Sequence, residues 1–130
     1  SEKMRIAGNG NVGIGTTNPQ AKLAVNGGIL AQEIKVKTDI SVPDYVFEPN
    51  YKMLSLKEIE TYVKENKHLP EMPSAKTIEE EGLNLAAMNL LLLKKVEELT
   101  LHLIEKDKLI SNQQDALIEV FRRLEKVEEK

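Results

Sequence analysis

The two histidines are the side chains best suited to chemistry at neutral pH, because an imidazole can carry a proton or bind a metal ion there. His68 and His102 lie far apart in the sequence, and the chain has no cysteine that could complete a zinc site with them. The sequence therefore predicts no metal or cofactor site. We expect His68 to be a loop residue bound by backbone groups, and His102 to flank an apolar helical stripe.

Acidic runs and glycines are the other candidates for chemistry. The runs at residues 79–81 and 97–98 are typical of solvated helix faces, not of paired catalytic carboxylates. The glycines between Gly8 and Gly15 do not open a helix, and no Lys-Ser or Lys-Thr pair follows them, so a phosphate-binding loop is not supported. No arrangement of Ser, His and Asp has the context of a hydrolase. We therefore expect no catalytic residues and a protein that is not an enzyme.

Composition argues against two further classes. The 21 acidic and 18 basic residues are mixed along the chain with a net charge of -3, so no basic surface for nucleic acid is indicated. The apolar cluster at residues 90–93 is far too short to cross a bilayer, and we expect no membrane span. No signal peptide is evident. Because the chain opens abruptly on Ser1, we expect it to be the C-terminal piece of a longer protein, so this absence has little weight.

Residues 85–127 contain no proline or glycine, and apolar residues recur there in alternating steps of three and four. This heptad pattern predicts one long helix that associates with copies of itself as a coiled coil. One extra residue before Val96 resembles a stutter. Lys106 and Gln113 fall on core positions, where polar groups typically fix register. The expected oligomerisation residues are Met88, Leu92, Val96, Leu99, Leu103, Lys106, Ile110, Gln113, Leu117, Val120, Leu124 and Val127.

Two alternatives stay open for this helix. The mixture of Val, Leu and Ile at the core positions does not choose between two and three strands. The polar segment 111–115 could also bend the helix into an antiparallel hairpin.

Residues 38–84 are predicted to form a small α+β unit. Ser55 and Glu58 form a capping box, which predicts a helix from Leu56 to Asn66. Residues 45–47 are expected to be a short strand, or an apolar anchor, against which that helix packs. Two prolines make residues 67–73 irregular. The expected core is Tyr45, Phe47, Leu56, Ile59, Tyr62 and Val63.

A second, shorter helix is predicted from Ala75 to Glu81, between Ser74 as its N-cap and Gly82 behind it. Asn84 then caps the long helix of residues 85–130.

Residues 1–37 are rich in glycine and asparagine, with short apolar runs at residues 4–6, 12–14, 23–25, 29–30 and 34–36. The turn residues between them predict three or four short strands. So few short strands are marginal alone, and we expect them to intertwine between chains. The overall fold class is thus α+β, in three parts: residues 1–37, 38–84 and 85–130.

Two groups of residues carry a resemblance to a known family. Residues 10–19 (GNVGIGTTNP) and 21–27 (AKLAVNG) resemble the repeat that precedes the C-terminal intramolecular chaperone domain of tail-fibre proteins and related bacterial surface proteins. Residues 43–47, 67–70, 73–75 and 89–99 resemble the version of that domain found in Bacteroidetes proteins called tail fibre domain-containing. The resemblance covers most of the chain to about Lys106.

The resemblance to endosialidase-type chaperone domains implies a homotrimer. In that family the C-terminal module brings three chains together and lets the upstream fibre segment wind into an intertwined β structure. It implies a non-catalytic trimerisation module that registers and caps a tail-fibre-like or cell-surface protein. It also implies an extracellular, cell-surface or virion location.

Two further functions follow as alternatives. Many family members cut themselves at a Ser-Asp bond, but this chain has none. The nearest pairs are Thr38-Asp39, whose hydroxyl could act as a nucleophile, and Pro43-Asp44, which has no hydroxyl. The loop at residues 68–72 could instead recognise a surface receptor or glycan.

Overall fold

A computed structural model of the chain describes residues 2–37 and 42–130. The fold is α+β and divides into two compact units, residues 1–37 and 38–130. The predicted boundary after residue 37 lies between these units, whereas residues 38–84 and the long helix belong to a single unit. The pair Thr38-Asp39, considered above as a cleavage site, lies outside the described residues.

The N-terminal unit is a three-stranded sheet of β1 (Met4–Ile6), β2 (Val12–Ile14) and β3 (Leu23–Val25), in that order. β1 and β2 are antiparallel, and β2 and β3 are parallel. The turn between β1 and β2 closes through Gly10, whose φ of 80° is accessible to glycine at little cost. These are the first three strands that the apolar runs predict.

The connection from β2 to β3 crosses close to the sheet at Gly13. A Cβ atom on Gly13 would lie 2.4 Å from the carbonyl oxygen of Thr16, so only glycine fits. The Asn11 side-chain amide donates to the carbonyl oxygen of the buried Pro19, at 3.1 Å. The connection is therefore fixed by close backbone approach and hydrogen bonds rather than by an apolar core.

No strand forms at the last two apolar runs of this unit, residues 29–30 and 34–36. Their apolar side chains are exposed, and Leu30 is completely so at 101%. Among its described residues, the single chain thus has three of the three or four strands expected. A short strand needs a neighbour to accept its backbone hydrogen bonds, and neither run is paired with a described strand.

The C-terminal unit begins with η1 (Pro43–Phe47), a 3₁₀ helix rather than the short strand considered above. Pro43 stands at its first turn, where a missing N–H costs nothing. Val46, only 1% exposed, is its buried residue along with Pro43, and η1 packs on the long helix. The expectation that Tyr45 and Phe47 pack on residues 56–66 is wrong, because η1 contacts the long helix instead.

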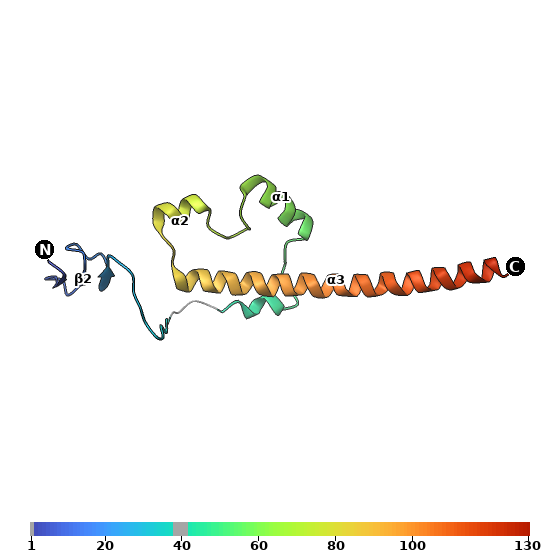
Figure 1. The fold of residues 1–130 in the computed structure, drawn as a ribbon, viewed down its shortest axis with the longest axis horizontal. Helices are drawn as coiled ribbons and strands as arrows, with labels where there is room; N and C mark the ends of the chain where they lie inside the picture. Colours follow the sequence, from blue (N-terminus) through green and yellow to red (C-terminus); the bar gives the residue numbers. More distant parts are fainter. Residues whose placement is uncertain (1, 38–41) are drawn as a thin grey trace. The chain divides into compact units, whose positions relative to one another are not determined.

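Three helices follow: α1 (Leu56–Asn66), α2 (Ala75–Glu81) and α3 (Leu85–Glu128) (Figure 1). α1 and α2 have the bounds that the sequence predicts, and all three helices have the expected N-caps. α3 ends at Glu128, two residues before the predicted end at residue 130. Ser55 and Glu58 form the capping box of α1, while Ser74 and Asn84 accept hydrogen bonds from the first turns of α2 and α3. Lys67 ends α1 in the left-handed conformation, at φ 62°.

α3 is one unbroken helix of 44 residues, and the hairpin alternative is wrong. Each polar residue of segment 111–115 costs only a few tenths of a kcal/mol of helix propensity, too little to end a helix. At 1.5 Å per residue α3 is about 66 Å long. From Leu103 onward every residue is exposed, so the second half of α3 extends as a bare helix (Figure 1).

Candidate oligomerisation surface

The apolar seam of α3 faces solvent along its length. Nine apolar side chains of the seam are each between 47% and 69% exposed: Leu92, Val96, Leu99, Leu103, Ile110, Leu117, Val120, Leu124 and Val127. Lys106 and Gln113 interrupt this seam and are exposed too, whereas Met88 is partly covered by its own chain. Because α3 is continuous, side chains at heptad spacing share one side of it. The structure therefore brings the predicted oligomerisation residues together as one stripe.

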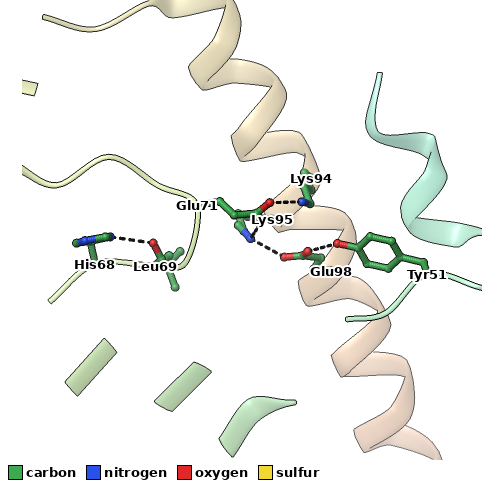
Figure 2. A network of polar contacts seen from close by, with 7 residues as sticks. All are labelled: Tyr51, His68, Leu69, Glu71, Lys94, Lys95 and Glu98. Atoms are coloured by element: carbon green, nitrogen blue, oxygen red, sulfur yellow. Dashed lines mark hydrogen bonds and ion pairs between the residues drawn. The ribbon is translucent and has the colours of Figure 1, made fainter. Parts of the chain in front are cut away.

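A network of polar and charged side chains ties the segments before α3 to the N-terminal third of that helix (Figure 2). Glu71 accepts hydrogen bonds from Lys94 and, at 2.7 Å, from Lys95. Lys95 also donates to Glu98 at 2.9 Å, and the Tyr51 hydroxyl donates to the same carboxylate. Residues on either side of α1 are thus tied to one stretch of α3.

Partial burial alone raises the pKa of the Glu71 carboxyl, but the hydrogen bonds and charges of Lys94 and Lys95 outweigh it and hold the pKa below its ordinary value. Burial likewise lowers the pKa of Lys95, and its two carboxylate partners more than reverse that effect. Burial, then the hydrogen bond to Glu98, raises the pKa of Tyr51. Glu71 and Lys95 are consequently ionised at neutral pH.

Sequence reasoning missed this network. Glu71 and the Lys94–Glu98 stretch are far apart in the chain, and Glu71 reaches the lysines from a left-handed backbone conformation, with φ 66°. The only local signal is the spacing of Lys95 and Glu98, which places them on the same side of a helix.

An open apolar groove of about 330 Å³ lies between α1 and α3. Its apolar walls come from both helices and the loop between α1 and α2: Leu56, Ile59, Leu69, Leu92, Val96 and Leu99. His102 also lines the groove and is only 5% exposed. Neither of its ring nitrogens has a hydrogen-bond partner among the described residues. His102 thus lies beside the seam and is buried in the groove.

The residues predicted to form the middle core do not form one in the single chain. Tyr45, Phe47 and Leu56 are exposed, and Ile59, Tyr62 and Val63 are only partly buried. Tyr62 packs edge-on against His68, with ring centroids 5.6 Å apart. Nδ1 of His68 lies 2.9 Å from the Leu69 carbonyl oxygen, which confirms the backbone contact expected for this loop histidine (Figure 2).

The sheet carries a second exposed apolar surface, which the sequence reasoning did not identify. In the observed register two rows of apolar side chains cross all three strands. Because side chains alternate between the two faces along a strand, both rows lie on one face of the sheet. The rows are Met4, Ile14 and Val25, and Ile6, Val12 and Leu23. The opposite face carries Arg5, Gly13 and Ala24. The apolar alternation was visible in the sequence, but the pairing that aligns the rows was not.

Among the described residues, no group of three or more His, Cys, Asp or Glu side chains could hold a metal ion. Within the same residues, no helix combines the length and apolarity needed to span a membrane. Comparison with known proteins finds no matching family model, no matching curated protein and no matching solved structure.

Proposed function

We propose that this chain is a non-catalytic assembly module: three copies associate through α3 and hold their N-terminal β segments in register within a longer fibrous protein. The observation that carries the proposal is the exposed seam. The stripe runs along a helix of 44 residues, and each of its apolar positions from Leu92 onward is at least 47% exposed. Such a stripe is unstable in water unless other helices cover it.

Copies of the same chain are the simplest partners for the seam. A heptad stripe fits the knobs-into-holes packing of parallel or antiparallel helices, and an isolated helix with its apolar side in water gains nothing from tertiary packing. The seam residues do not select the number of chains. The resemblance to chaperone domains of tail-fibre proteins favours three, and favours a place at the cell surface or on a virion.

The N-terminal unit gives an independent reason for assembly. The sheet leaves an apolar face uncovered by its own strands, and residues 29–30 and 34–36 have strand-like patterns without strand partners among the described residues. Copies held together by α3 would present these segments to one another at high effective concentration. Strand pairing between chains, which is slow and prone to register errors, would then begin from an aligned start.

The test is the solution mass of the chain and the state of its N-terminal unit. We expect a three-chain particle by light scattering, and slow amide exchange at residues 29–36 only when the particle forms. A particle of three chains in which residues 29–36 exchange freely would support trimerisation and refute the registering role.

A further inference from the structure

The groove between α1 and α3 shares a wall with the seam. Leu92, Val96 and Leu99 line the groove and are also predicted oligomerisation residues. A helix that covers the seam at this level must therefore lie along the mouth of the groove. The opposite wall, formed by Leu56 and Ile59 of α1, then becomes a surface within reach of that helix.

The charges beside the seam favour a parallel partner. With Val96 at heptad position a, His102 and Arg123 occupy position g, and Asp107 and Glu128 occupy position e. In a parallel, in-register coiled coil, each g residue lies beside the following e residue of its neighbour. His102 then meets Asp107, and Arg123 meets Glu128. The second pair joins opposite charges, the first places an imidazole beside a carboxylate, and no g–e pair along α3 joins like charges.

The same arrangement identifies which side of the neighbour faces the groove. The groove lies on the side of α3 that carries Lys95 and His102, both at position g. The neighbour therefore presents its e residues there, and Thr100 is the one level with Lys95. Thr100 and Leu93, the preceding e residue, are both exposed in the single chain.

His102 indicates that the groove is incomplete in the single chain. A buried polar side chain without a hydrogen-bond partner costs about 1–3 kcal/mol. In the parallel arrangement the neighbour's e side brings a carboxylate, that of Asp107, level with His102. The e side of a second chain thus brings apolar surface to the groove and a carboxylate to the level of His102.

We propose that the groove between α1 and α3 is a docking site for a second copy of this chain, whose α3 enters with Leu93 and Thr100 in parallel orientation. α1 of each chain then packs across its neighbour. This inference rests on the proposed function, because it assumes that copies associate through the seam.

The experiment uses the absence of cysteine from the chain. Two full-length variants, Ile59→Cys and Thr100→Cys, are unfolded together, refolded as a mixture and treated with a short bis-maleimide. We expect a two-chain product joined between positions 59 and 100, which peptide mapping identifies. The matched control mixes Thr61→Cys with Thr100→Cys, because Thr61 is exposed on α1 outside the groove, and should give little of this product.

The mass of each mixture, measured by light scattering, separates the possible results. A three-chain particle without the 59–100 product overturns the docking site and leaves the proposed function intact. Single chains overturn both. If Ile59→Cys prevents folding, Leu69→Cys tests the same groove from the loop, and a three-chain particle without a 69–100 product then refutes the proposal. A product of equal yield in the Thr61→Cys control also refutes it.

Discussion

Replacing two seam residues with glutamine should dissociate the assembly without breaking the single chain. Leu103 is 62% exposed and Ile110 is 53% exposed, so neither supports the fold of its own chain through burial. Covering the exposed part of such a side chain contributes about 1–2 kcal/mol, given about 1.5–3 kcal/mol for a fully buried one. Glutamine is a good helix former, so the variant Leu103→Gln/Ile110→Gln changes the seam and little else.

The size of the effect follows from the number of copies. With two substituted positions in each of three chains, the association free energy lost is roughly 6–12 kcal/mol per trimer. Since 1.4 kcal/mol is a factor of ten, the association constant should fall about 10⁴–10⁸-fold. The concentration at half-assembly varies with the square root of that constant, so it should rise roughly 10²–10⁴-fold. Helicity should fall with it, because the exposed half of α3 has no other packing.

Light scattering over a dilution series, with circular dichroism on the same samples, measures both effects. The matched control is Ile104→Gln/Ile118→Gln, which removes two apolar side chains that are 47% and 65% exposed but lie off the seam. The control should assemble like the unaltered chain. If the seam variant assembles at the same concentration as the control, or if both dissociate equally, the seam has been assigned wrongly.

Three other changes test separate parts of the structure. Gln113→Leu removes a polar core layer and should raise the melting temperature by several degrees while allowing mixed chain numbers, both measurable by calorimetry and light scattering. Glu71→Gln should lower stability to urea at neutral pH. Because the pKa of Glu71 is depressed in the folded state, this difference should shrink as the pH falls below 4.5, and a constant difference would refute a stabilising role for the Glu71 carboxylate. Gly13→Ala should destabilise the sheet by about 1–3 kcal/mol, because the added Cβ would overpack against Thr16. Gly8→Ala, with open space around it, should leave the sheet unchanged. Amide exchange of the strands measures both effects.

The helices were predictable because their signals are local. Each helix begins after a capping residue that apolar residues at helical spacing follow: Ser55 (with Glu58) for α1, Ser74 for α2 and Asn84 for α3. The seam of α3 was equally readable, since heptad spacing needs no tertiary information. Residues 45–47 were ambiguous because three apolar residues fit a short strand or an apolar anchor, and only the packing of η1 on α3, with Val46 buried, decides between them.

The rest depended on contacts between distant segments. The charged network joins Glu71 to Lys94 and Lys95 through a left-handed residue that no sequence pattern indicates. The groove exists only because α1 stands beside α3, and the burial of His102 follows from that placement. The apolar face of the sheet required the strand register.

The mass of the unaltered chain in solution tests the central claim most directly. Sedimentation equilibrium at micromolar concentration should give three times the chain mass of 14.6 kDa, falling toward one chain only at high dilution. A particle of 14.6 kDa that keeps its full helix content at every concentration would contradict the account, because α3 would then be stable with its apolar stripe in water.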